Sequence, residues 1–132
     1  MHIDKINQRI KEVNQLVLDL SSKYNWFDFQ FSLIQEGIVR LEGCFDLTAL
    51  YKTYDKIEIE FFNAIFIKTI LYEWQLQKEK SFIELDRHND ILKELNISDD
   101  KYYAFKINTD SGESILIIAE DLKCAVITKD RL

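Results

Sequence analysis

The sequence contains no proline, only three glycines and only two cysteines among its 132 residues. A phosphate-binding loop needs several glycines so that backbone N–H groups can approach the phosphates, so no such loop is expected. Cys44 and Cys124 are far apart, and neither belongs to a Cys-x-x-Cys or Cys/His pattern of a zinc site. Because no apolar secretion signal opens the chain, both are expected to be reduced, buried thiols of a cytoplasmic protein.

Basic charge and long apolar runs are also scarce. The chain has 17 Lys and Arg residues against 23 Asp and Glu residues, which gives a net charge of −6. This charge disfavours binding to nucleic acid or to an anionic membrane surface, because both need clustered basic residues. No apolar run reaches the ~18 residues of a membrane-spanning helix. The charge is compatible with a basic protein partner, and equally with ordinary solubility.

The sequence does have enough apolar and aromatic side chains for one well-packed domain. Hydrophobic residues make up 47% of the chain and aromatic residues 13%. A chain of this size can bury roughly two-thirds of its unfolded surface. We therefore predict a single α+β domain over residues 1–132.

The stretch from Ile57 to Tyr72 is the longest run of β-branched and aromatic residues. Its first half alternates apolar residues with glutamates, which indicates a strand with one buried face. The alternation breaks at Asn63, a residue type that tolerates left-handed backbone dihedrals. We predict two strands over 56–62 and 65–72, or one long kinked strand.

The other elements follow from periodicity in the rest of the chain. They are a helix over 4–22, a hairpin of strands 26–34 and 38–45, a strand over 82–85, a helix over 87–95 with Asp86 as its N-cap, and strands over 102–108, 113–119 and 123–128. Gly43 inside a strand indicates a bulge or a close approach by another element. Residues 73–80 receive no assignment. The predicted fold is an N-terminal helix packed on an antiparallel sheet of about six or seven strands, with a second short helix before a C-terminal β-meander.

No catalytic constellation is evident. His88 lies between Asp86 and Asp90, which could orient it as a general base. Residues two apart at a helix start point in different directions, however, so the three side chains are not expected to converge. The segment beginning at Asn108 resembles a calcium loop but lacks its glycine spacing and its final acidic ligand. We favour a protein that is not an enzyme and needs no cofactor or metal, and an enzyme built around His88 is the alternative.

Acidic side chains concentrate between residues 84 and 100, and two tyrosines follow directly. Acids steer a basic partner toward a surface, and aromatic side chains supply much of the binding energy of interfaces. We predict a surface for a basic protein formed by Glu84, Asp86, Asp90, Glu94, Asp99, Asp100, Tyr102, Tyr103 and Trp74. The alternative interpretation is an ordinary solvated helix and loop.

A second functional hypothesis rests on rows of phenylalanines. Phe29, Phe31, Phe61 and Phe66 could line an aromatic pocket for a small molecule between helix and sheet. The same rows are typical of simple core packing. An exposed edge strand could in addition support a homodimer, although the sequence does not indicate which edge.

Two stretches resemble small bacterial α+β families of unknown function. Residues Ile57–Ala64 are similar to a strand of these families, and Ile115–Leu122 is similar to their closing hairpin. Some of the families are assigned as immunity proteins of contact-dependent or polymorphic toxin systems. The resemblance implies a small cytoplasmic protein that binds and blocks a toxin, such as a basic nuclease, and it brings no catalytic residues.

Overall fold

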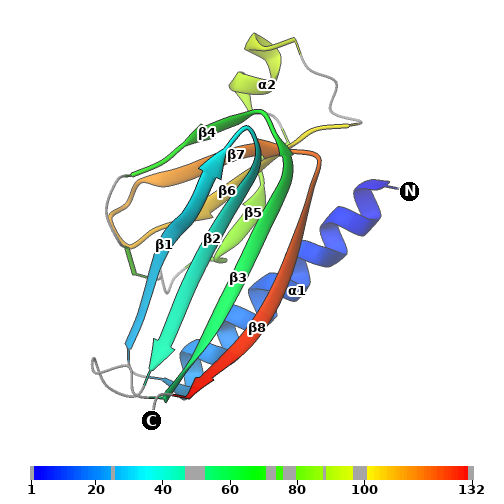
Figure 1. The fold of residues 1–132 in the computed structure, drawn as a ribbon. Coiled ribbons are helices and arrows are strands. Elements are labelled where there is room, and N and C mark those ends of the chain that lie inside the picture. Colours follow the sequence, from blue (N-terminus) through cyan, green and yellow to red (C-terminus); the bar gives the residue numbers. More distant parts are fainter. Residues whose placement is uncertain are drawn as a thin grey trace.

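The computed structural model describes residues 2–24, 26–46, 53–70, 74–75, 80–87, 89–96 and 101–130. Within these ranges the chain forms two helices and eight strands (Figure 1). In chain order they are α1 (His2–Lys23), β1 (Trp26–Gln35), β2 (Gly37–Asp46), β3 (Thr53–Ala64), β4 (Phe66–Lys68), β5 (Ile83–Leu85), α2 (Asp90–Glu94), β6 (Tyr103–Asn108), β7 (Ser114–Ala119) and β8 (Asp121–Asp130). The predicted α+β class, with an N-terminal helix on antiparallel strands, is confirmed.

The strands form two antiparallel sheets instead of the one sheet predicted. The strand order is β1-β2-β3-β8 in the long sheet and β4-β7-β6-β5 in the short sheet. The predicted C-terminal meander is wrong in its last step, because β8 leaves β7 and pairs with β3 over its whole length. Glu120 separates β7 from β8 and turns the chain from one sheet into the other.

The chain passes between the two sheets twice at the same corner, from β3 to β4 and from β7 to β8. Asn63 has a φ of 52° and bends the chain between β3 and β4, as its tolerance of left-handed dihedrals predicts. Two backbone hydrogen bonds bridge the corner, from Ile65 N to Ile118 O (2.9 Å) and from Glu120 N to Phe62 O (3.0 Å). The pairing of β3 with β8 therefore continues into the pairing of β4 with β7, and one bent ladder joins the two sheets.

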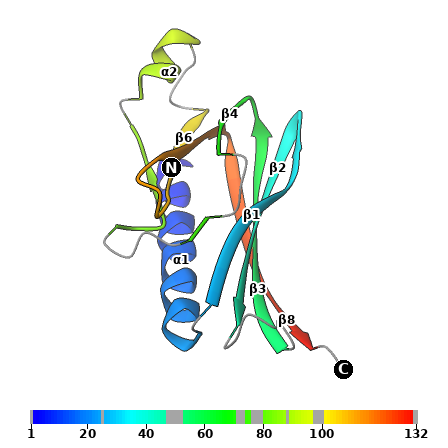
Figure 2. The same ribbon diagram turned by 90° about the vertical axis from the view of Figure 1, so that its left-hand side faces the viewer.

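The main core lies between α1 and the two sheets. Figure 2 shows α1 lying along one face of the long sheet, with the short sheet over the end of this layer. The apolar stripe of α1 contributes five buried side chains, Ile6, Ile10, Val13, Val17 and Leu20. Every second residue of β3 faces this stripe, and Ile57, Ile59 and Phe61 are fully buried. The predicted alternation of β3 therefore marks its covered face correctly.

Gly43 allows a close approach inside the long sheet, as predicted. A Cβ on Gly43 would lie 2.4 Å from Cε1 of Phe29 on the neighbouring strand β1. The ring of Phe29 is fully buried, and it also packs against Phe45 and Phe82, with centroids 5.7 and 4.8 Å away. Only glycine leaves room for this ring.

Asn14 fastens α1 to the edge of the short sheet. Its Nδ2 donates to the carbonyl of Ile83, and its Oδ1 accepts from the amide of Ile83, both at 2.9 Å. The side-chain amide thus takes the place of a neighbouring strand beside the edge strand β5. The helical pattern gives no sign of this contact, because Asn14 looks like any polar residue beside the apolar stripe.

The two cysteines lie on opposite faces of the long sheet. Cys44 is opposite Lys56 in the ladder and Cys124 is opposite Ile59, so Cys124 faces the main core and Cys44 faces away from it. Both are half-buried, so the burial predicted for the two thiols is only partial. Burial, reinforced by the carboxylate of Glu12, raises the pKa of the Cys124 thiol to about 11. This thiol is therefore protonated and unreactive at neutral pH.

Candidate functional site

Two of the acids predicted for the binding surface lie on α2. Asp90 and Glu94 are exposed on this helix, and Lys93 is exposed between them in sequence. Glu84 lies on β5, where its carboxylate pairs with Lys106 on β6 at 3.4 Å. The described acids are therefore accompanied by two lysines, and the local charge is lower than the acid count alone suggests. The predicted residues Asp99 and Asp100, and His88 of the enzyme hypothesis, lie outside the described residues.

Asp86 belongs to the approach to α2 and is not its N-cap. Asn89 caps the helix instead, because its Oδ1 accepts a hydrogen bond from Ile91 N at 2.8 Å. Asp86 accepts a hydrogen bond from Asn89 Nδ2 at 2.9 Å and so holds the capping residue in place. The helix is shorter than the predicted span 87–95, since it begins only after this cap.

Trp74 and Tyr103 are core residues, so their predicted place on a binding surface is corrected. Their side chains are 2% and 5% exposed. Trp74 makes two backbone hydrogen bonds with Phe29 (2.9 and 3.2 Å), and its ring packs against Phe29 and Phe31. Tyr103 opens β6 and packs in the main core. Acidic neighbours in the sequence do not predict that an aromatic side chain is exposed, because successive residues of a strand point to opposite faces.

Tyr102 is half-buried in a second apolar group on the outer face of the short sheet. This α2 cluster consists of buried Leu92, Ala104, Leu116 and Ile118, with Phe66, Ile91 and Tyr102 packed against them. Lys101 Nζ lies 5.5 Å from the centroid of the Tyr102 ring. The helix α2, which projects at one end of the molecule in Figure 1, thus covers the face of the short sheet that is turned away from the main core.

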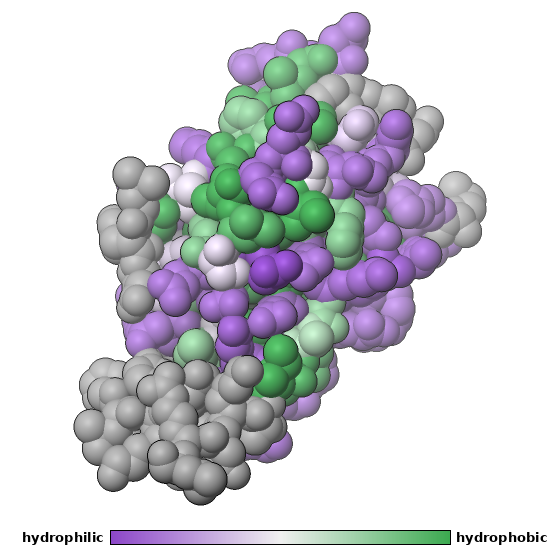
Figure 3. Space-filling model, viewed as in Figure 1, coloured by the Kyte–Doolittle hydropathy of each residue, from purple (hydrophilic) through white to green (hydrophobic). Residues whose placement is uncertain are grey.

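A hollow of 450 Å³ opens where the tip of the β1–β2 hairpin meets β4. This corner hollow is lined by Ile34, Gln35, Glu36, Val39, Ala64, Ile65, Phe66 and Ile67. Two of its isoleucines are largely exposed, Ile34 at 50% and Ile65 at 46%. Figure 3 shows apolar surface gathered in the upper half of the view, which is the half that contains β4 in Figure 1. Paired exposed isoleucines on one hollow form a patch, which is more informative than single exposed apolar residues.

Phe66 connects the corner hollow with the α2 cluster, because it lines the first and packs in the second. Leu95, directly after α2, is 45% exposed. The corner hollow and the α2 cluster are together called the corner surface below. This surface combines the exposed side chains of Ile34, Ile65 and Leu95 with the partly buried side chains of Phe66, Ile91 and Tyr102.

The sequence prediction missed the corner hollow because it assumed unbroken alternation along β1. The register of β1 against β2 shifts between Phe31 and Leu33. The shift turns Ile34 to the face of its partner Val39, where Ile34 lines the corner hollow and is half exposed. The available signal was the apolar doublet Leu33–Ile34 at the end of a strand that alternates up to that point.

The four phenylalanines of the pocket hypothesis do not line a common pocket. Phe29 and Phe61 are fully buried in the main core, and Phe31 packs against it. The ring of Phe61 contacts that of Phe105 across the two sheets, with centroids 5.4 Å apart. Phe66 belongs to the α2 cluster instead. These rows are therefore packing contacts.

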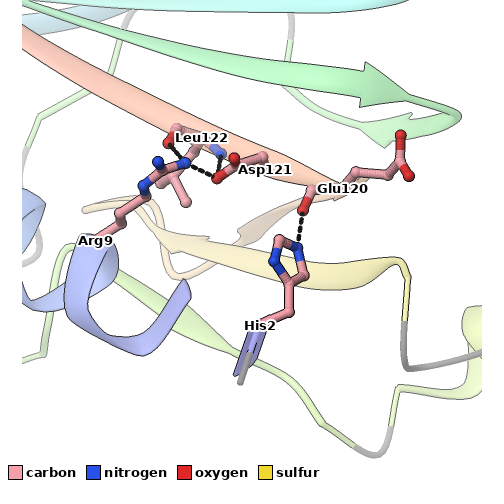
Figure 4. A network of polar contacts seen from close by, with 5 residues as sticks. All are labelled: His2, Arg9, Glu120, Asp121 and Leu122. Carbon is pink, nitrogen blue, oxygen red and sulfur yellow. Dashed lines mark hydrogen bonds and ion pairs between the residues drawn. The ribbon is translucent and has the colours of Figure 1, made fainter. Parts of the chain in front are cut away.

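A polar network fastens the start of α1 to the corner (Figure 4). Arg9 forms an ion pair with Asp121 and donates a hydrogen bond to the carbonyl of Leu122 at 3.3 Å. His2 Nε2 lies 3.4 Å from the carbonyl oxygen of Glu120. Burial opposes ionisation of Asp121, but hydrogen bonds from Arg9 and from Leu122 N outweigh it and lower its pKa below the ordinary 3.8. The network holds the helix in place.

The outer face of the long sheet is charged but balanced. Lys56 Nζ lies 2.8 Å from Glu42 and 3.2 Å from Glu58, and Arg40 lies 3.0 Å from Glu60. The hydrogen bond with Glu42 raises the pKa of Lys56, burial opposes this shift, and Glu58 adds to it. The three glutamates Glu42, Glu58 and Glu60 are therefore each paired with a cation of the same face.

In the part of the chain that the structure describes, no three His, Cys, Asp or Glu side chains form a group that could hold a metal ion. Neither described helix has the length and apolar character of a membrane span. Comparisons with protein-family models, curated proteins and solved structures found no match. Function is therefore inferred from the surfaces of the molecule.

Proposed function

We propose that the protein is a non-enzymatic protein-binding module and that the corner surface is its contact site. The observation that carries the proposal is the exposure of Ile34 and Ile65, 50% and 46%, on one hollow of 450 Å³. A contiguous apolar patch with polar surroundings is typical of a protein interface. An apolar side chain of the partner would fill the corner hollow and cover both isoleucines.

The charge of the protein favours a basic partner. Glu36 lines the corner hollow, and Asp90 and Glu94 are exposed on the neighbouring α2. The whole chain carries a net charge of −6. Such a charge steers basic proteins toward the surface and disfavours acidic ones. The proposed partner is a basic protein that presents an apolar anchor.

A basic toxin is one partner with this chemistry. The families that residues Ile57–Ala64 and Ile115–Leu122 resemble include immunity proteins of polymorphic toxin systems. In this proposal the protein neutralises the toxin by binding it one to one, and the complex forms without any chemical reaction. The buried Trp74 and Tyr103 have no direct role in it, and Asp90, Glu94 and Tyr102 remain from the predicted residue set.

The first test is capture of a partner from lysate of the source organism at low and at high salt, followed by identification and by binding measurements with the purified partner. The double variant Ile34→Asp, Ile65→Asp should weaken binding at least tenfold, because it places charge where an apolar anchor should sit. Leu18→Asp is the matched control, since Leu18 is 62% exposed on α1. Unchanged affinity of the double variant, or equal weakening by the control, would contradict the proposed site.

The role of charge is tested separately with Asp90→Asn, Glu94→Gln. Rim charges act mainly on the association rate, so this variant should bind more slowly and with less dependence on salt, while the dissociation rate changes little. An association rate that is independent of salt in the unaltered protein would remove the basic partner from the proposal.

A further inference from the structure

The two sheets have four edges, of which β4 and β5 are only 3 residues long, and a described residue pairs with one position of the 10-residue edge β1. Trp74 pairs with Phe29 on the edge strand β1. Asn14 holds both backbone groups of Ile83 on the edge strand β5. The edge strand β4 has only 3 residues. The remaining edge is β8, with 10 residues.

The outer edge of β8 is little protected beyond its first residues. Arg9 donates to the carbonyl of Leu122 near the start of the strand. From residue 123 to 130, the backbone makes no hydrogen bond with the backbone of any other described residue outside its ladder with β3. Natural proteins usually protect such an edge with charges, proline, bulges or a covering segment. In β8 the positions between Lys123 and Lys129 read Cys-Ala-Val-Ile-Thr, without charge or proline.

Two residues of this middle segment are exposed. Val126 is 40% exposed although every second residue of β8 before it faces the main core. Ala125, on the other face, is exposed as well. A regular edge strand whose middle five residues carry no charge and include an exposed valine is a template for another strand.

We propose that β8 pairs with β8 of a second copy of this chain, so that the two long sheets join into one continuous antiparallel sheet. A self-complementary contact of this kind closes as a two-fold dimer, because the same surface is used by both copies. The two-fold axis is perpendicular to the sheet, and residues that face each other therefore share the same side of it. The corner hollow is lined by residues 34–39 and 64–67 and by no residue of β8, so it stays open in the dimer.

The charges of β8 select the register of this pairing. An axis at Val126 would bring Lys123 opposite Lys129, and like charges at facing positions destabilise a sheet. An axis at Ala125 avoids this contact and faces Cys124 with Val126 on the inner side. Axes farther toward either end shorten the ladder. The proposed dimer is therefore centred on Ala125.

One paired edge buries less than the ~800 Å² per partner of a standard stable interface, so we expect a reversible dimer that depends on concentration. Sedimentation velocity over a concentration series should give a mass that rises from the 15.7 kDa of one chain toward twice this value. Val126→Lys should keep the protein monomeric, because it sets a charge on the exposed edge. Leu18→Lys on α1 is the matched control and should dimerise like the unaltered protein.

Circular dichroism and thermal melting of both lysine variants establish that they are folded. A mass of one chain at every concentration would overturn the proposal and leave β8 open to a strand of another protein. A dimer that persists in folded Val126→Lys would also overturn it.

The register is tested by cross-linking in a Cys44→Ala, Cys124→Ala background. Ala125→Cys places two thiols at the axis, within the Cα separation that a disulfide allows. Treatment with oxidised glutathione should therefore give a covalent dimer. Val126→Cys in the same background is the control, because its thiols lie diagonally across the axis and beyond that separation. Preferential cross-linking of Val126→Cys would overturn the register centred on Ala125.

Discussion

The long sheet and the short sheet are built from strands of different character. The long sheet has strands of 10, 10, 12 and 10 residues, with one face on α1 and the other toward solvent. The short sheet has strands of 3, 3, 6 and 6 residues. In β7 every residue after Ser114 is buried, because the main core covers one face and the α2 cluster covers the other.

This difference explains the two sequence patterns. Residues 57–61 alternate apolar and acidic side chains, whereas Ile115–Ile118 is apolar throughout. Alternation therefore marks a strand with one covered face, and an unbroken apolar run marks a strand between two layers. The apolar run Ile115–Ile118 accordingly belongs to a central strand, since β7 lies between β4 and β6.

The largest effect is expected from a side chain that joins the two sheets. Phe61 is fully buried, and its ring packs against Phe105 of the short sheet. Phe61→Ala should lower the free energy of unfolding by about 3–5 kcal/mol, because the cavity it leaves borders both sheets. Urea denaturation followed by circular dichroism measures this loss, and it should remain a single transition.

Phe62→Ala is the matched control on the opposite face of β3. Phe62 is half-buried there, with Lys123 Nζ 5.4 Å from its ring centroid. Its removal should cost only about 1 kcal/mol. Equal losses for the two variants would show that the covered and uncovered faces do not differ as described.

A smaller effect is expected from the two hydrogen bonds by which Asn14 joins α1 to the short sheet. Asn14→Ala leaves the amide and carbonyl of Ile83 without this partner, which should cost about 1–3 kcal/mol. Hydrogen exchange should quicken at β5 and remain unchanged in the middle of β3. Gln15→Ala is the control, because Gln15 contacts only the exposed Asp19 in the described structure. Faster exchange in β3 would mean that the hydrogen bonds of Asn14 stabilise the whole fold and not only the edge at β5.

The smallest effect is expected from the ion pair at the corner. The pKa of Asp121 is lower in the folded protein than in the unfolded chain, so its charge adds stability above pH 3.8, and this contribution is lost as the pH falls through the folded pKa. Asp121→Asn should cost up to about 1 kcal/mol at neutral pH, because the pair is partly solvated.

The measurement is the difference in denaturation midpoint between the unaltered protein and Asp121→Asn across a pH series. The difference should shrink as the solution becomes more acidic. Asp19→Asn, exposed on α1, is the control for the loss of one negative charge. A difference that does not change with pH would show that the Asp121 charge contributes nothing to stability.

Local patterns were enough to predict most elements but not their partners. The stripe of α1, the hairpin of strands 26–34 and 38–45 and the break at Asn63 each depend on a few neighbouring residues, and the structure has all three. The return of β8 to β3 depends on residues far apart in the chain, so no local pattern reveals it. A smooth alternation likewise hides the bulge after Phe31.

The candidate site was harder to predict than the fold. An acidic stretch predicts charge, and Asp90 and Glu94 are exposed accordingly. It does not predict which aromatic residues remain outside, and Trp74 and Tyr103 are packed in the core. The corner hollow is formed by two segments, 34–39 and 64–67, that only the fold brings together.

The shared corner has a consequence for how the protein is made. The whole short sheet and α2, residues 66–119, lie between β3 and β8 in the chain, although β3 and β8 are neighbours in space. During synthesis β3 emerges long before its partner, and at about 5–20 residues per second it waits several seconds for β8. In that interval β3 is itself an open edge, which makes the nascent chain most vulnerable to association with other chains just before the corner closes.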